Sequence, residues 1–457
     1  MNNILLVEPA YRSKFPPLGL LRISSYHKEK GDFVIFVRGK VPEMRNRNWN
    51  RVYVSSLFTY ELPRTIDTIK YYSRTVPDPS GDIFVGGIGA TLLPSYIRER
   101  VACKIIEGPL NRNDMLGKGT PPIDSYIPDY DIIKSISYKY KPDDAYFFRV
   151  TVGCIRECTF CAVPKLEPKF SFLDNFYKQI RAANEKFGER QNMILMDNNI
   201  LAVDDLENVI ADIRNAGFEA GAKRNGRKRI VDINQGIDAR LITSDIATLL
   251  STINLEPIRL AFDFVGMEKQ YKQAIDLLVK VGFSSFTNYV MFNFNDDPKS
   301  LYHRLKVNIE ESQKHGIRIT SFPMRYVPID DVNRRYVSRG WQWRYLRGIQ
   351  CVLNATHGVV SPNANFFEGA FGKTYEEFLE ILSMPDQYII YRKVFENNKA
   401  LDWKTAFRKL PESDREDFLG ILAQLNKSKN RQSEIRNYKK YISLLEHYYP
   451  NGKSFIL

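Results

Sequence analysis

Three of the five cysteines in this 457-residue chain lie within eight residues, at Cys154, Cys158 and Cys161. Their spacing is Cys-x3-Cys-x2-Cys, in the segment GCIRECTFC. Three thiolates on one short loop can ligate three irons of a [4Fe–4S] cube and leave the fourth iron without a protein ligand. An open coordination position on a metal is where a cofactor or substrate binds. The segment therefore predicts a metal centre with a chemical role.

Two other sites use cysteines in this way: a closed zinc site and a four-cysteine ferredoxin cluster. Both need a fourth ligand. The remaining cysteines, Cys103 and Cys351, are remote in sequence, and the histidines nearest in order are His27 and His303. The fold could still bring one of these side chains close, so a zinc or ferredoxin-type site stays an alternative. An odd number of cysteines is a poor disulfide framework and favours a reducing compartment.

The cysteine segment directly follows an apolar strand expected at residues 146–152, the first of a second series of strands and helices. Six parallel strands with helical crossovers predict a partial (β/α)6 barrel over residues 145–331. The other five strands are expected at 193–196, 229–233, 259–262, 287–292 and 317–322.

The chain before this region alternates short apolar strands with helical stretches over residues 1–110, with glycines at strand ends. This pattern predicts a Rossmann-like, doubly wound parallel sheet. Residues 111–144 are rich in Pro, Gly, Asn and Asp and predict a linker or strap. Residues 332–457 predict a mostly helical C-terminal region. The expected fold class is therefore α/β, with a helical region at the end.

Composition limits the classes of function. The net charge of +13 favours a phosphate-bearing or otherwise acidic partner without proving one. Two basic segments stand out, at 223–229 and 334–344, and the second interleaves arginine with aromatic residues. No apolar run reaches the roughly 18 residues of a membrane span, and no signal peptide is recognisable. We expect a cytoplasmic protein with no membrane partner.

At Gly153–Cys161 the sequence resembles the radical S-adenosylmethionine (SAM) superfamily, whose cluster motif has this spacing and usually an aromatic residue before the last cysteine, here Phe160. The resemblance covers roughly residues 145–330. It implies a [4Fe–4S] cluster and SAM as cofactors, and an electron donor such as flavodoxin or ferredoxin as a partner. In that family one electron from the cluster splits SAM into methionine and a 5′-deoxyadenosyl radical, which abstracts hydrogen from a substrate.

Further SAM contacts are expected at the carboxyl ends of the barrel strands. The family often has a Gly-Gly-Glu turn after the second strand, and this chain departs from that pattern with Asp197-Asn198. Helix capping and loop ion pairs are the alternative roles for such residues. The expected cofactor-binding side chains are Phe160, Asp197, Asn198, Gln235, Asp238, Arg240, Asp263 and Arg325. No catalytic residue is predicted.

The N-terminal region resembles the cobalamin-binding domain that precedes the barrel in one large subgroup of this superfamily. The resemblance rests on Pro16-Pro17-Leu18-Gly19 after the first strand, and on Gly86-Gly87 and Glu107-Gly108 after later ones. Such domains often carry an Asp-x-His-x-x-Gly loop whose histidine ligates cobalt. Here the loop is Glu8–Ser13, without histidine. The domain therefore either binds cobalamin without histidine or is a cobalamin-free remnant, and Gly86-Gly87 has the alternative role of a tight turn.

Methylthiotransferases, another subgroup, bind a second cluster through three N-terminal cysteines. Only Cys103 precedes the motif here, so we do not expect a second cluster of that kind. If cobalamin binds, methylation or a carbon-skeleton rearrangement is the natural outcome. The substrate stays open between a small molecule, a nucleotide and a nucleic acid. The alternative function is a non-catalytic iron–sulfur or zinc protein that binds nucleic acid through its basic surface.

Overall fold

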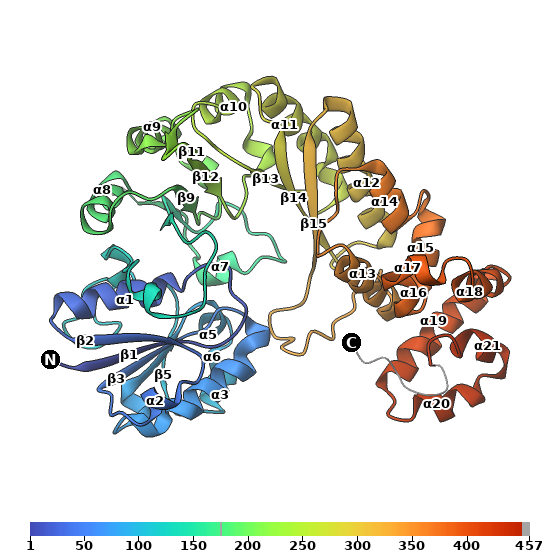
Figure 1. Ribbon diagram of the computed structural model, residues 1–457, viewed down its shortest axis with the longest axis horizontal. Helices are drawn as coiled ribbons and strands as arrows, with labels where there is room; N and C mark the ends of the chain where they lie inside the picture. Colours follow the sequence, from blue (N-terminus) through green and yellow to red (C-terminus); the bar gives the residue numbers. More distant parts are fainter. Residues whose placement is uncertain (174–175, 450–457) are drawn as a thin grey trace. The chain divides into compact units, whose positions relative to one another are not determined.

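The computed structural model describes residues 1–173 and 176–449. The chain forms two compact units (Figure 1). Unit 1 comprises Met1–Ile258 and Pro328–Arg335, and unit 2 comprises Arg259–Val327 and Tyr336–Leu457. The division into four parts expected from the sequence, at residues 110, 144 and 331, stays a prediction.

Unit 1 begins with a five-stranded parallel sheet in the order β2-β1-β3-β4-β5. In this order the topological switch point, where the strand order reverses, lies between β1 and β3, and at such a point the carboxyl ends of open parallel sheets form a crevice. The strands are β1 (Asn3–Glu8), β2 (Phe33–Arg38), β3 (Arg51–Ser55), β4 (Ile83–Gly86) and β5 (Lys104–Ile106). The helices are α1 (Leu18–Glu29), α2 (Pro42–Arg45), α3 (Leu62–Tyr72), α4 (Pro79–Asp82), α5 (Ile88–Leu92) and α6 (Pro94–Arg98).

Helices cover both faces of this sheet (Figure 1). Successive strand side chains point to opposite faces, so a strand buried on both sides must be apolar throughout. In β1, Leu5 and Val7 pack in the apolar core that α3 contributes to, whereas Ile4 and Leu6 pack in the core that α1 contributes to. This arrangement confirms the predicted doubly wound sheet.

The three clustered cysteines of unit 1 lie next to a second group of strands. Its parallel strands are ordered β12-β9-β6, and a short antiparallel pair, β7 with β8, flanks the cysteine segment. The basic run at 223–229 forms another small hairpin, β10 with β11. The strands are β6 (Ala145–Phe148), β7 (Thr151–Val152), β8 (Ser171–Phe172), β9 (Asn192–Leu195), β10 (Lys223–Arg224), β11 (Arg227–Lys228) and β12 (Ile230–Ile233). The helices are α7 (Val163–Leu166), α8 (Phe176–Phe187), α9 (Leu206–Ile213) and α10 (Ser244–Leu250).

Unit 2 contains the remaining strands, in the order β13-β14-β15, with α11 and α12 between them. Five of the last six strands predicted from the sequence form as single strands, and the first, expected at 146–152, is divided into β6 and β7. The strands alternate with helices as expected. The strands are β13 (Ile258–Ala261), β14 (Ser285–Phe292) and β15 (Arg318–Arg325), and the helices are α11 (Glu268–Lys280) and α12 (Pro298–His315).

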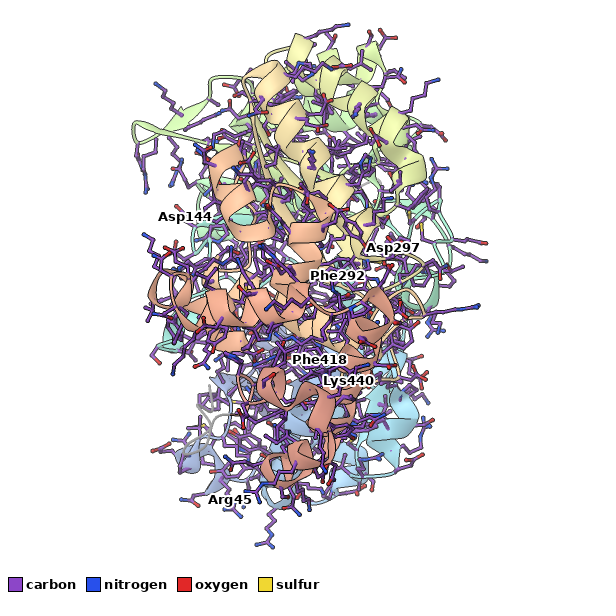
Figure 2. All side chains as sticks on the ribbon, turned by 90° about the vertical axis from the view of Figure 1, so that its right-hand side faces the viewer. Arg45, Asp144, Phe292, Asp297, Phe418 and Lys440 are labelled. Carbon is purple, nitrogen blue, oxygen red and sulfur yellow. The ribbon has the colours of Figure 1, made fainter. Side chains whose placement is uncertain are left out.

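The C-terminal region of unit 2 is helical, as predicted. Its apolar core includes Phe292 at the end of β14 and Phe418 in α19, both labelled in Figure 2. The helices are α13 (Trp343–Ala355), α14 (Ala364–Phe371), α15 (Tyr375–Ser383), α16 (Asp386–Ile390), α17 (Arg392–Phe395), α18 (Lys399–Arg408), α19 (Glu412–Lys427), α20 (Arg431–Glu434) and α21 (Ile442–Leu445). Across the described residues, none of the helices combines the length and apolar character that a membrane crossing needs.

The buried sheet core gives a stability prediction. Leu5 is fully buried in β1, whereas Phe33, in the neighbouring β2, is 40% exposed. We expect Leu5→Ala to lower the free energy of unfolding by about 2–5 kcal/mol, because it removes apolar contacts and leaves a cavity. Phe33→Ala is the control in the same sheet and should cost clearly less. Chemical denaturation followed by circular dichroism measures both, and equal losses would contradict this account of the core.

Candidate metal centre

The three cysteines lie on a loop, Cys154–Cys161, that follows β7; we call it the cysteine loop. All three side chains are partly exposed, and none of them forms a disulfide. Gly153 starts the loop with a positive φ of 75°, which favours glycine. A Cβ atom there would lie 2.5 Å from the carbonyl oxygen of Lys169, so the close approach of these two backbone segments also requires glycine.

Nitrogen donors point at two of the three sulfur atoms. The backbone N–H of Arg156 donates to Cys154 Sγ at 3.4 Å, and that of Val163 donates to Cys161 Sγ at 3.5 Å. Asn199 Nδ2 donates to Cys154 Sγ at 3.6 Å. Such donors stabilise thiolates, the form in which cysteine ligates metal, and they influence the potential of iron–sulfur clusters. The donor set therefore fits the predicted cluster.

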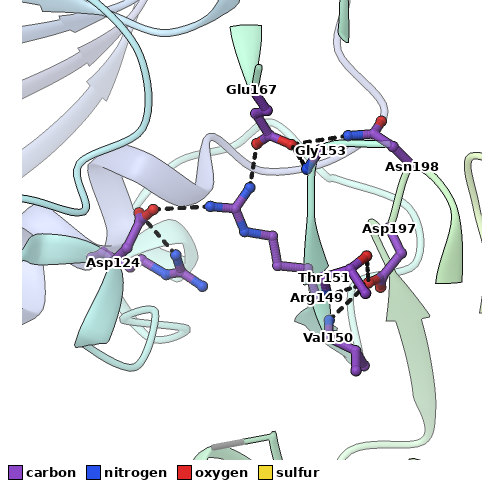
Figure 3. A network of polar contacts seen from close by, with 9 residues as sticks. Asp124, Arg149, Val150, Thr151, Gly153, Glu167, Asp197 and Asn198 are labelled. Carbon is purple, nitrogen blue, oxygen red and sulfur yellow. Dashed lines mark hydrogen bonds and ion pairs between the residues drawn. The ribbon is translucent and has the colours of Figure 1, made fainter. Parts of the chain in front are cut away.

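Asp197 lies directly beyond β9, as predicted, but its first role is structural. Its Oδ1 accepts from the backbone N–H groups of Val150 and Thr151, at 2.9 and 2.6 Å, and from the Thr151 hydroxyl at 2.7 Å (Figure 3). The side chain is fully buried, and its Oδ2 has no hydrogen-bond partner in the part of the chain that the structure describes. Burial raises the pKa of Asp197 to about 6, although these three hydrogen bonds oppose the shift.

The two asparagines after Asp197 have different partners. Asn198 Nδ2 donates to Glu167 at 3.0 Å, next to the start of the cysteine loop. Asn199 is 2% exposed, and its Oδ1 is buried without a hydrogen-bond partner among the described residues. The sequence analysis selected Asp197 and Asn198 and missed Asn199, the one of the three that contacts a cysteine. The available signal was a run of three polar residues at a strand end, which does not say which of them faces the loop.

A second group of predicted residues joins the cysteine loop after β12. Asp238 pairs with Arg156 of the loop at 3.0 Å and with Arg240 at 2.6 Å. Burial raises the pKa of Asp238, but hydrogen bonds from these arginines outweigh it, so the pKa lies below its usual value. Asp238 raises the pKa of Arg240, and the charges of Cys158 and Cys154 add to this shift, so the guanidinium lies within their electrostatic range.

The other predicted residues are less closely tied to the loop. Phe160 is half-buried within it, and Gln235 is exposed after β12. Asp263 and Arg325 belong to unit 2, whereas all the preceding candidates belong to unit 1. There, Arg325 donates to the Tyr336 carbonyl at 2.6 Å, and the Asp263 carbonyl accepts from Arg304 at 2.9 Å. A role in cofactor binding stays a prediction for all eight residues.

Arg304 is a second residue that the sequence did not reveal. It is fully buried in α12 and donates to the carbonyl groups of Phe262, Asp263 and Met291 and to the Asp296 carboxylate. Its guanidinium thereby holds the carboxyl ends of β13 and β14 together. An arginine inside a helical pattern carries no sequence signal for such a role.

Unit 2 also holds a small ion cluster that was not predicted. The carboxylates of Asp276 and Glu311 and the ring of His315 bring their ligand atoms within 4.8 Å of one another. Lys314 Nζ lies 3.2 Å from Asp276 and 3.3 Å from Glu311. The Lys314 ammonium and the His315 ring both lie against these two carboxylates, so the cluster is an ion-pair network between α11 and α12.

A cavity of about 420 Å³ opens at the carboxyl ends of β1, β3 and β4, within unit 1. Its wall is mainly apolar and extends to Met196, the residue before Asp197; it includes Leu20, Ile23, Phe58, Phe84 and Ile106. Ser56 also lines the cavity; it is 1% exposed, and its hydroxyl lacks a hydrogen-bond partner among the residues described. A buried hydroxyl in that state calls for an explanation, and a bound polar group is one.

The loop Glu8–Ser13, which stands where cobalamin-binding domains often carry a cobalt-ligating histidine, is held by a hydrogen bond between its two ends. Glu8 is buried at the end of β1 and accepts from Ser13, Arg38 and Tyr140, at 2.8, 2.9 and 2.6 Å. Gly87, which also lines the cavity, has a φ of 103°, and a Cβ there would lie 2.5 Å from the Ser56 carbonyl oxygen. The alternative role of the Gly-Gly pair, a tight turn, is therefore real, whatever the cavity binds.

Comparison with known proteins gives structural matches only. No family model matches the sequence, and no curated protein matches it. The chain is similar to the apo structure of OxsB, described as a cobalamin-dependent S-adenosylmethionine radical enzyme. The TM-score is 0.47 at 12% identity, over 97% of this chain and 76% of that one.

Two further structures match over less than half of this chain. One is SuiB from Streptococcus suis bound to S-adenosylmethionine, with a TM-score of 0.32, 10% identity, and coverage of 46% and 47% of the two chains. The other is coproporphyrinogen III oxidase (HemN) from Escherichia coli, described as a radical SAM enzyme, with a TM-score of 0.29, 12% identity, and coverage of 43% and 48%. The chain spans about half the length of each. At these similarities we transfer no residue role.

The buried carboxyl of Asp197 gives a pH prediction. Because its folded-state pKa is raised, the folded protein keeps a proton that the unfolded chain releases above about pH 4. Its contribution to stability is therefore present at low pH and is lost as the pH rises through about 6. Asp197→Asn keeps an acceptor oxygen and does not titrate. Between about pH 4 and pH 7 we expect the variant to gain up to about 3 kcal/mol relative to the wild type.

The measurement compares the unfolding free energies of the two metal-free proteins over this pH range. Titration of all other groups is common to both chains and cancels in the difference. A difference that does not change with pH would show that Asp197 is ionised throughout and would contradict the assigned shift.

Proposed function

We propose that this protein is a radical SAM enzyme whose cluster is held by Cys154, Cys158 and Cys161. The observation that carries the proposal is the cysteine loop itself. It presents three partly exposed thiols on one turn, with N–H donors to Cys154 and Cys161. Three cysteine ligands leave one iron of a [4Fe–4S] cluster open. When bound there, the cluster and SAM supply a one-electron reductive cleavage that is followed by hydrogen abstraction.

The protein's own part is to hold and orient SAM beside the loop. SAM carries an ammonium and a carboxylate group. Asn199 Oδ1 and Asp197 Oδ2 are buried and have no hydrogen-bond partner among the described residues, and these oxygens are suited to accept from the ammonium. Arg240, which is close enough to feel the charges of Cys154 and Cys158, is suited to pair with the carboxylate.

The proposal also concerns the protein's surroundings. An exposed set of thiols and an iron–sulfur cluster require a reducing compartment, which supports a cytoplasmic location. The reaction needs an electron, and we propose a flavodoxin or ferredoxin as its donor. The substrate is not identified by any of these residues.

The central test is SAM cleavage by the full-length protein, reconstituted anaerobically with iron and sulfide and reduced with dithionite. We expect 5′-deoxyadenosine to be released with the wild type and not with Cys158→Ala, because the cluster loses a ligand. Cys103→Ala is the control, since this cysteine lies outside the loop in the N-terminal region. A loaded cluster that cleaves no SAM, with the wild type binding nucleic acid instead, would favour the non-catalytic alternative.

We further propose that the cavity of unit 1 binds part of a cobalamin without a histidine ligand. Three observations support this: the cavity lies at the carboxyl edge of a doubly wound sheet, its wall is apolar, and the Ser56 hydroxyl has no partner there among the described residues. A volume of about 420 Å³ corresponds to one arm of so large a molecule rather than to the whole of it. Bound cobalamin would make methylation or a rearrangement the natural outcome of the reaction.

Gly19 offers a way to fill this cavity. It belongs to α1 and lines the cavity, and a Cβ added there meets no atom within 4 Å. We expect Gly19→Phe to reduce retained cobalamin at least about tenfold, because the ring takes the ligand's place. Gly420→Phe is the matched control, a helical glycine of α19 with equally open space.

The visible spectrum after incubation with hydroxocobalamin and gel filtration measures the bound vitamin. Equal retention by wild type and both variants would place the vitamin elsewhere. No retention by the wild type would identify the domain as a cobalamin-free remnant.

A further inference from the structure

We propose that Glu167 is the positioning residue of the cysteine loop, and that Arg149, Asp124 and Arg22 anchor it to the N-terminal sheet. The inference rests on the proposed function, in that the loop is taken to carry a [4Fe–4S] cluster. Glu167 would touch neither SAM nor substrate, and it would act through the backbone that carries Cys154.

The Glu167 carboxylate binds at the start of the cysteine loop. Its Oε2 accepts from the backbone N–H of Gly153 at 2.7 Å and from Asn198 Nδ2 at 3.0 Å (Figure 3). Gly153 precedes the first cysteine, and Asn198 precedes the asparagine that contacts the sulfur of that cysteine. One carboxylate thus ties the start of the cysteine loop to the turn after β9.

Glu167 is held in place by its position at the end of helix α7. Its backbone N–H donates to the Val163 carbonyl at 2.8 Å and so ends the short helix α7, which begins just after Cys161. The segment that leaves the cysteine loop therefore returns a side chain to the residue that enters it. The two segments that flank the loop are thus joined by a hydrogen bond that does not involve the sulfur atoms.

The charge of Glu167 is compensated by a chain of ion pairs. Arg149 pairs with Glu167 through Nη1 and with Asp124 through Nη2 at 3.0 Å, and Asp124 pairs with Arg22 of α1 at 3.0 Å. The four side chains are only 8–21% exposed, so solvent screens them little. Removing one member of such a partly buried chain of ion pairs leaves the charge of its neighbour uncompensated. We therefore expect each substitution in the chain to have a measurable effect.

The reduction potential of the cluster distinguishes a positioning role of Glu167 from a merely structural one. The reduction potential of an iron–sulfur cluster depends on the net charge and hydrogen bonds around it. Glu167→Gln keeps an acceptor for Gly153 and loses a negative charge, so it should raise the potential. Arg149→Gln loses the compensating positive charge, so it should lower the potential. A simple loss of stability would not move the potential in two opposite directions.

The experiment uses the full-length, cluster-loaded protein. Redox titration followed by electron paramagnetic resonance gives the midpoint potential, and transfer of iron to a chelator gives the rate of cluster loss. We expect the two shifts of opposite sign, a double variant near the wild type, and iron loss from Glu167→Ala that is faster by roughly 10–100-fold. Glu256→Gln is the control in unit 1, because this carboxylate pairs with Lys228 at the surface.

Potentials that stay at the wild-type value in both single variants, with unchanged iron loss, would overturn the role of Glu167. If the wild type takes up no cluster, the proposed function fails, and the two claims separate. The role of Glu167 is then judged on the metal-free protein by the rate of Cys154 alkylation. That rate should rise in Glu167→Ala and not in Glu256→Gln, and equal rates would overturn it.

Discussion

The turn at Gly153 is the constraint on which the rest of the candidate site depends. The chain must leave β7 and present three thiols within eight residues, and it does so while its backbone passes against the carbonyl oxygen of Lys169. A side chain cannot occupy that space, and the positive φ excludes most other residues. The loop that results is held from outside, by Glu167 at its start and by Asn199 at Cys154.

Polar side chains at the strand ends already bind groups of the protein itself. One oxygen of Asp197 accepts hydrogen bonds from the backbone N–H groups of Val150 and Thr151, and the other is buried without a hydrogen-bond partner among the described residues. Asp238 holds two arginines, one of which belongs to the cysteine loop. The alternative expected from the sequence, capping and ion pairing, holds for Asp238, whereas Asp197 binds backbone groups beside β7. The Asp197 oxygen without a partner among the described residues and the Arg240 guanidinium are the groups that a cofactor could bind.

The sequence predicted what depends on local patterns and missed what depends on tertiary contacts. Short apolar strands and three clustered cysteines are visible along the chain, and so the sheet of unit 1 and the loop could both be anticipated. Asn199, Glu167 and Arg304 could not, because each acts through atoms far away in sequence or through backbone groups of other strands. Asp263 and Arg325 follow the same strand-end pattern as Asp197, yet they belong to the other unit.

The proposed enzyme depends on three cysteines that hold a [4Fe–4S] cluster whose fourth iron is open to SAM. Electron paramagnetic resonance of the reduced, reconstituted protein, with and without SAM, tests this directly. We expect the signal of a reduced [4Fe–4S] cluster that changes when SAM is added, because SAM ligates the open iron. The same spectrum with and without SAM, in a protein that holds a full complement of iron, would contradict it.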